Sequence, residues 1–177
     1  MSANEQTPKS PDGIGEKHAR PVAGWRRHSS PLSLVVFGLV IALSLVGALG
    51  HERDWRAHGN GVQLDVHSPE TIRSGEMLEV RIGVESDRPI SDLVVGVEQS
   101  LWEDMTVNTM IPAATEESSA DGEFRFSFGE LHPGTAFLLK VDLQINPDIL
   151  GGNDGRVTVY DGENPLVEIP ISITVLP

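Results

Sequence analysis

Histidines and carboxylates between residues 51 and 58 are the first side chains in this sequence whose types and spacing could bind a metal. The segment HERDWRAH contains His51 and His58, seven residues apart, with two acidic residues between them. Imidazole nitrogens and carboxylate oxygens are ligands for Zn²⁺ and Cu²⁺. The two histidines lie on one side of the chain only if a helix continues through the segment. The alternative interpretation is a polar collar that solvates the chain at this point.

Acidic residues in predicted turns supply a second set of candidate ligands. Asp148 and Asp154 lie in a segment rich in Gly and Asn, and hard oxygen ligands in flexible loops suit Ca²⁺. No Asp-x-Asp-x-Asp-Gly pattern accompanies them, and turn formation alone explains Asp in these positions. The sequence therefore assigns no metal site, and His51, His58, Asp148 and Asp154 stay as candidates.

Recognisable catalytic motifs are absent. The sequence contains neither Gly-x-Ser-x-Gly nor His-Glu-x-x-His, the patterns of a nucleophilic serine and of a zinc protease. It has no cysteine, which excludes disulfides, thiolate nucleophiles and cysteine metal ligands. We predict that the protein is not an enzyme and that it uses no cofactor.

The charge of the chain is concentrated in its C-terminal part. Residues 57–177 carry 6 Lys and Arg against 21 Asp and Glu, a net charge of −15. Proteins bind nucleic acids by placing Lys and Arg against phosphates. A nucleic-acid partner is therefore excluded.

An uncharged apolar run precedes this acidic part. Residues 31–50 carry no charge, and 12 of the 20 are Leu, Val, Ile or Phe. As a helix they would rise about 30 Å, the thickness of a bilayer's hydrocarbon core. Arg26 and Arg27 precede the run, and Trp25 and Trp55 flank it, where indoles sit at a membrane interface. The pattern predicts a transmembrane helix at residues 31–50, with the membrane as one partner.

Orientation follows from the basic residues on the N-terminal side. The positive-inside rule places residues 1–30 in the cytoplasm, and their polar composition predicts disorder. The C-terminal part would then be periplasmic or extracellular, on a single-pass protein of the inner or plasma membrane. The alternative is a cleavable leader with a cut before His51.

Residues 62–177 alternate apolar and polar side chains in many short segments. The segment AFLLKVDLQI (136–145) places Phe, Leu, Val, Leu and Ile on one face, and VEIPISITV (167–175) alternates in the same way. Such alternation is typical of strands with one face in a core and one in water. Turn pairs such as Asp-Gly and Pro-Gly separate the segments. We predict an all-β fold, an antiparallel immunoglobulin-like sandwich of 7–8 strands, with residues 51–61 as a linker.

Two segments carry a resemblance to a known group of domains. The segment FSFGELHPGTAFLLKVDLQINP (126–147) resembles the signature of bacterial and archaeal immunoglobulin-like surface modules, including the cell-adhesion-related domain. The terminal GRVTVYDGENPLVEIPISITVLP is similar to their closing hairpin. The resemblance covers residues 62–177. It implies the fold and a role in adhesion, spacing or binding, and it supplies no active-site residues.

Candidate contacts for a partner lie at a loop and at the last strand. Ile149 and Leu150 form an apolar tip in a Gly-rich loop, which either caps the end of the sandwich or contacts another protein. Ile171 and Ile173 belong to a final strand that could accept a partner's strand. The alternative is that Pro170 in this strand prevents such pairing. The predicted function is binding or scaffolding, as an accessory subunit or surface-interaction module for another membrane or envelope protein. The alternative is a metal-handling or assembly factor for a membrane complex.

Overall fold

The structure is a computed structural model that describes residues 24–45, 52–146 and 151–177. The chain divides into two units, Met1–Val46 and Gly47–Pro177. In the first unit the described residues form helix α1 (Gly24–Leu45). In the second they form eleven strands and a short 3-10 helix, which are β1 (Glu52–Gly59), β2 (Val62–Pro69), β3 (Thr71–Arg73), β4 (Met77–Ser86), β5 (Leu93–Glu98), η2 (Gln99–Leu101), β6 (Met105–Ile111), β7 (Glu116–Ala120), β8 (Glu123–Ser127), β9 (Ala136–Ile145), β10 (Gly151–Asp161) and β11 (Asn164–Leu176).

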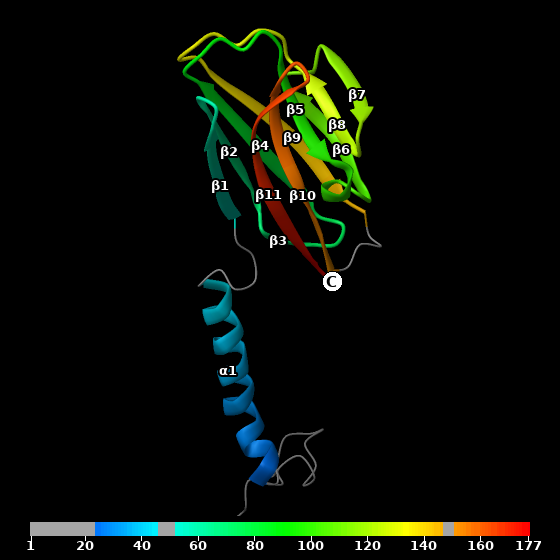
Figure 1. The fold of residues 1–177 in the computed structure, drawn as a ribbon. Helices are drawn as coiled ribbons and strands as arrows, with labels where there is room; N and C mark the ends of the chain where they lie inside the picture. Colours follow the sequence, from blue (N-terminus) through cyan, green and yellow to red (C-terminus); the bar gives the residue numbers. More distant parts are fainter. Residues whose placement is uncertain (1–23, 46–51, 147–150) are drawn as a thin grey trace, which may run out of the picture. The chain divides into compact units, whose positions relative to one another are not determined.

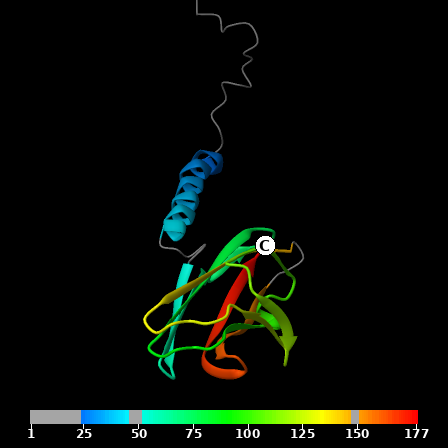
Figure 2. The ribbon, with the colours of Figure 1, turned by 90° about the horizontal axis from the view of Figure 1, so that it is seen from above.

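The strands of the second unit form two sheets that pack face to face (Figure 1). One sheet has five strands in the order β1-β2-β4-β9-β6, and the other has six in the order β3-β11-β10-β5-β8-β7. Neighbouring strands pair antiparallel, except that β3 runs parallel to β11. Figure 2 shows the same sheets from above. The order places β6 at one edge of the first sheet and β7 at one edge of the second.

The core lies between the sheets and follows the alternation of the sequence. In β2 every second side chain is buried, and β4 and β9 show the same period. In β11 the inward positions are Ile and Val. The largest completely buried side chains come from both sheets, and include Leu64, Ile82, Ile90, Leu93, Leu139, Leu143, Ile145 and Ile173. The prediction of an all-β, two-sheet sandwich is therefore confirmed.

The strand inventory differs from the sequence prediction of 7–8 strands. The structure has eleven, and β1 occupies residues that the sequence predicts as part of a linker at 51–61. This strand pairs with β2 along its whole length. Its inward side chains Trp55 and Ala57 pack against the core, while its outward side chains are mostly charged. A charged edge strand has little apolar alternation, so the sequence pattern alone does not reveal it.

The predicted transmembrane helix at residues 31–50 is wrong. Helix α1 begins at Gly24 and ends at Leu45, so it starts in the polar segment and stops before the predicted end. Within the described residues, no helix has both the length and the apolar composition needed to cross a bilayer.

Two further predictions depended on that helix. The membrane as a partner is not retained. Trp55, predicted at a membrane interface, instead lies in β1 and packs against the sandwich core. Residues 1–23, and with them most of the predicted disordered tail at 1–30, lie outside the described residues, as do residues 46–51. The location of the C-terminal unit outside the cytoplasm stays a prediction.

Candidate functional site

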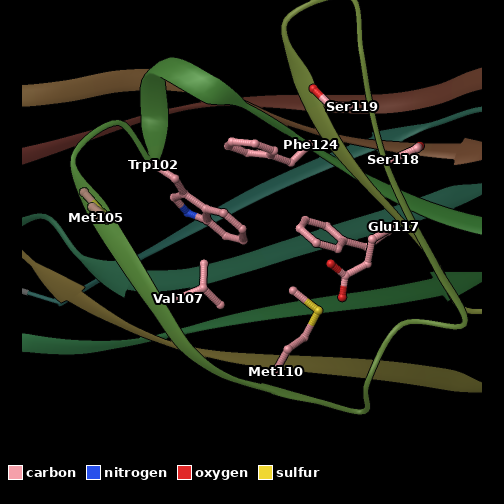
Figure 3. Close-up of a pocket in the computed structure, with 9 residues that line it drawn as sticks. Trp102, Met105, Val107, Met110, Glu117, Ser118, Ser119 and Phe124 are labelled. Carbon is pink, nitrogen blue, oxygen red and sulfur yellow. The ribbon is translucent and has the colours of Figure 1, made fainter.

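One side of the sandwich is open between the edge strands of the two sheets. The opening, which we call the β6–β7 cleft, has a volume of about 500 Å³ and lies between β6 and the β7–β8 hairpin (Figure 3). It is larger than a packing defect and falls in the range of ligand pockets. Its lining is mostly apolar and consists of Trp102, Met105, Val107, Met110, Glu117, Ser118, Ser119, Phe124 and Phe126.

Strand β6 forms one wall of the cleft because a bulge keeps three apolar side chains on its inner face. Met105, Val107 and Met110 pair with core positions of β9, and the register shifts between Val107 and Thr109. The extra residue, Asn108, resets the alternation, as a β-bulge does. Without it, strict alternation from Val107 would turn Met110 outward. All three side chains therefore face the second sheet.

Val107 shows that the core is incomplete at this edge. Its partner across the strands is Leu143, which is completely buried. Val107 nevertheless keeps 45% of its surface exposed. A side chain that faces the interior of a sandwich normally meets the facing sheet. Here the opposite position is empty, and Val107 lies against the open cleft.

The β7–β8 hairpin forms the other wall. Phe124 and Phe126 of β8 pair with buried valines of β5, so both rings face inward. On β7 the residues beside them are Ser119 and Glu117. Glu117 therefore occupies an inward-facing position on an edge strand, and Figure 3 shows its carboxylate directed into the cleft. Within the described part of the chain it has no ion-pair partner.

Trp102 closes one end of the cleft. It follows η2 and is 5% exposed, with its ring centroid 5.9 Å from that of Phe126. The turn that leads from Trp102 into β6 is closed by a hydrogen bond from the Met105 N–H to the Trp102 carbonyl. Asp104 has a φ of 58° in this turn, a conformation that Asp adopts more readily than most residues.

Strand β10 fixes the position of η2 through a close backbone approach. A Cβ atom on Gly155 would lie 2.7 Å from Cβ of Leu101 and 3.0 Å from its backbone nitrogen. Glycine is thus the only residue that fits without a shift of η2. Asn153 adds hydrogen bonds from its amide to the carbonyls of Leu101 and Glu103. These contacts hold Trp102 at the end of the cleft.

A polar network on the outer face of the second sheet supports the phenylalanine wall. Glu123 of β8 is 8% exposed, and its carboxylate accepts a hydrogen bond of 2.6 Å from the hydroxyl of Tyr160. The Arg125 guanidinium lies 4.9 Å from the centroid of the Tyr160 ring. Gly96 makes room, because a Cβ there would lie 2.8 Å from that ring. The network joins β8 to β10, so Phe124 keeps its inward direction.

Burial raises the pKa of Tyr160, and the hydrogen bond and charge of Glu123 raise it further. The phenol therefore stays neutral and donates its proton in the hydrogen bond throughout the physiological range.

The chemistry of the cleft suits binding rather than bond cleavage. In the lining as described, Glu117 is the one acidic or basic side chain, next to two serine hydroxyls. Hydrolytic sites often place two titratable groups together with pKa values set apart, and this lining contains one. Large apolar side chains around a single charge are typical of a surface that recognises another apolar group. The prediction that the protein is not an enzyme stays a prediction.

Of the predicted metal ligands, the structure places His58 and Asp154, and it does not bring these two together. His58 lies on β1 and Asp154 on β10, which belong to different sheets. His51 and Asp148 lie outside the described residues. Over the ranges that the structure describes, no three histidine or acidic side chains are grouped as a metal site requires.

Of the predicted partner contacts, the structure places Ile171 and Ile173. Ile171 and Ile173 are 4% and 1% exposed and belong to the core. The end of their strand, from Thr174 to Leu176, is paired with β3. Ile149 and Leu150 lie outside the described residues.

The predicted membrane flanks on the N-terminal side lie in α1. Trp25, Arg26 and Arg27 fall in its first turns, and their side chains lie outside the described part of the structure.

Sequence reasoning missed the β6–β7 cleft. The strand MTVNTMI is expected from the sequence, but its bulge is not, and EESSA (116–120) shows no apolar alternation. The available signal was the absence of any charge across MTVNTMI in an otherwise acidic domain.

No protein-family model matches this chain, and no curated protein matches it. Among solved structures, it is similar to CaCohA2 from Clostridium acetobutylicum, with 17% identity and a TM-score of 0.44 over 66% of this chain and 92% of that chain. It is also similar to a non-cellulosomal cohesin from the archaeon Archaeoglobus fulgidus, with 10% identity and a TM-score of 0.38 over 60% and 86% of the two chains. At these values neither protein lends its function to this chain. The resemblance to the cell-adhesion-related domain stays a prediction.

Proposed function

We propose that the sandwich is a protein-binding module that accepts apolar side chains of a partner protein in the β6–β7 cleft. The observation that carries the proposal is Val107, which faces the core in the register of its sheet and yet is 45% exposed. Covering such exposed apolar surface with another apolar group removes it from water and lowers the free energy of the complex. A partner that fills the cleft would complete the core at this edge.

The composition of the lining favours a protein as the occupant. Trp, Phe and Met are enriched at the centres of protein interfaces, and all three line this cleft. Trp102 and Phe126 are fixed in the core, so docking against them costs little side-chain entropy. The cleft runs between two strand edges, so an extended polypeptide can lie along it.

More than one side chain must enter the cleft for binding to be stable. Burying one Val- or Leu-sized side chain contributes about 1.5–3 kcal/mol. Association itself costs about 4 kcal/mol or more. The volume of about 500 Å³ accommodates several such groups. We therefore expect an extended segment with several apolar residues rather than a single inserted side chain.

The test is a selection of random peptides displayed on phage against the purified protein. Two variants serve as counter-targets. Val107→Asp places a charge in the cleft. Leu138→Asp is the matched control, because Leu138 is a similarly exposed apolar residue, at 49%, on the neighbouring strand β9 but outside the cleft lining.

We expect enriched peptides that bind the wild type and Leu138→Asp alike and bind Val107→Asp at least about tenfold more weakly. Enrichment of no peptide, or of peptides that bind all three proteins equally, would overturn the proposal.

A further inference from the structure

The four edge strands of the sandwich differ in how they are protected against pairing with another strand. Natural sheets protect their edges with charged residues or by keeping the edge short. Strand β1 carries four charged residues among its first five, ERDWR, and β3 has three residues. Strand β7 begins with two glutamates. Strand β6 has seven residues, MTVNTMI, and no charge.

The free edge of β6 is long enough to pair with a partner. Seven residues exceed the length of an average strand. One edge of β6 is paired with β9, and β6 is the last strand of its sheet. Its other edge therefore presents backbone donors and acceptors to solvent. The bulge at Asn108 interrupts this edge, but it also turns Met110 toward the cleft, where an added strand would meet it.

We propose that the partner binds by adding a β-strand to the free edge of β6, with alternate side chains entering the β6–β7 cleft and a Lys or Arg among them pairing with Glu117. This inference rests on the proposed function and specifies its mode. An added strand lies about 4.8 Å from β6. Its inward side chains then continue the row formed by Val107 and Met110 and lie against the phenylalanine wall. The backbone bonds supply affinity and the cleft supplies selectivity.

Charge identifies the partner's segment as basic. Glu117 is directed into the cleft (Figure 3) and has no ion-pair partner among the described residues. The part of the chain from residue 57 onward has a net charge of −15. A second copy of this domain would bring the same charge and be repelled. A segment with a cation between apolar residues complements both the lining and the field around it.

The probe for this proposal is a capped synthetic peptide of about nine residues in which Val alternates with Thr and one Val is replaced by Lys. Two further versions carry N-methyl groups on alternate amides, one starting at the first residue and the other at the second. A fourth version has Glu in place of Lys. Binding to the full-length protein is measured by calorimetry, and Val107→Asp, Leu138→Asp and Glu117→Gln are measured in parallel.

Strand addition uses the amides on only one side of the added strand. We therefore expect the parent peptide to bind with a Kd below about 1 mM, one methylated version to lose at least about tenfold in affinity, and the other to retain it. The peptide with Glu should bind at least about threefold more weakly than the one with Lys. Glu117→Gln should remove that difference and leave the effect of methylation unchanged.

The outcomes separate this inference from the proposed function. Binding that Val107→Asp abolishes, with equal affinity of both methylated versions, would overturn strand addition and leave the cleft as the binding site. Equal affinity of the Lys and Glu peptides for the wild type would overturn the pairing with Glu117. Absence of any binding that depends on Val107 would overturn both proposals.

Discussion

Removing one hydroxyl group, in Tyr160→Phe, tests the network that holds the phenylalanine wall of the cleft. The Tyr160 hydroxyl donates to the Glu123 carboxylate at 2.6 Å, and the two residues are 7% and 8% exposed. A hydrogen bond to a charged group contributes about 1.5–3 kcal/mol. Glu123 keeps a contact of 3.4 Å with the Arg125 guanidinium in the variant, so we expect the lower half, about 1.5–2 kcal/mol, of lost unfolding free energy.

The effect depends on pH in a defined direction. Burial, with Glu123 adding to it, raises the pKa of Tyr160 above its unfolded value of about 10. A group with a raised pKa contributes stability that is complete below the unfolded pKa and is lost as pH rises through the folded pKa. The wild type therefore loses this contribution above about pH 10, and Tyr160→Phe has none to lose. The two proteins should converge in stability as pH rises past 10.

Urea denaturation of both proteins between pH 7 and pH 11 measures this difference. Tyr160→Phe conserves the ring, its packing against Gly96 and its contact with Arg125, so the comparison isolates the hydroxyl. A wild type no more stable than the variant at pH 7 would contradict the assigned hydrogen bond. A gap that stays constant up to pH 11 would contradict the linkage to the phenol.

Two further substitutions test the elements that shape the cleft. Gly155→Ala should destabilise the protein by about 1–3 kcal/mol, because the new Cβ would lie 2.7 Å from Cβ of Leu101. Gly83→Ala is the control and should be nearly neutral, since the nearest side-chain atom there is 3.7 Å away. Thermal unfolding compares the two variants, and equal melting temperatures would contradict the contact with η2. Phe126→Ala should lower the unfolding free energy by about 3–4 kcal/mol, because the ring is 8% exposed and packs on Trp102. Tryptophan fluorescence and chemical denaturation measure the effect. Unchanged tryptophan emission with unchanged stability would place the ring outside the core.

The strands predicted from the sequence are those with one buried and one solvated face. Strands β2, β4 and β9 alternate strictly in burial, and their sequences alternate in the same way. Strands β1 and β7 were not predicted, because ERDWRAHG and EESSA have almost no apolar period. Backbone pairing holds such strands at an edge, and backbone groups are the same in every residue. An edge strand can therefore be polar throughout and still be a strand, and a search for apolar alternation does not find it.

The helix illustrates the opposite failure. The apolar run at 31–50 matches the length of a membrane span by composition, but composition does not fix where a helix begins and ends. Helix α1 starts seven residues earlier, at Gly24, and ends at Leu45. Helix ends depend on capping and on local backbone conformation, which the apolar content of a segment does not report. The predicted transmembrane helix therefore fails, and the described residues contain no helix that is long and apolar enough to cross a bilayer.

The cleft could not be predicted because it results from the pairing of two edges that are distant in the sequence. At the opposite edge of the first sheet, Trp55 of β1 packs against the core. At the cleft, the inward positions of β7 are Glu117 and Ser119, which cannot fill an apolar space. Polar residues at inward positions of an edge strand therefore keep this side open. The same two residues look in the sequence like part of a solvated loop.

If polar residues of β7 keep the β6–β7 cleft open, the open cleft lowers the unfolding free energy of the protein. Glu117→Leu places an apolar side chain in the cleft, over Val107 and Met110, and should raise the unfolding free energy by about 0.5–2 kcal/mol, as filling an unfilled site commonly does. The same substitution should weaken binding of the Lys-containing peptide, because it removes the charge and occupies the space. Glu116→Leu is the matched control, since Glu116 lies on the same strand, pairs with Ser127 on the outer face of β8 and lies outside the cleft lining. A Glu117→Leu protein less stable than Glu116→Leu would contradict the explanation, because the cleft would then be held open by packing and not by the polarity of β7.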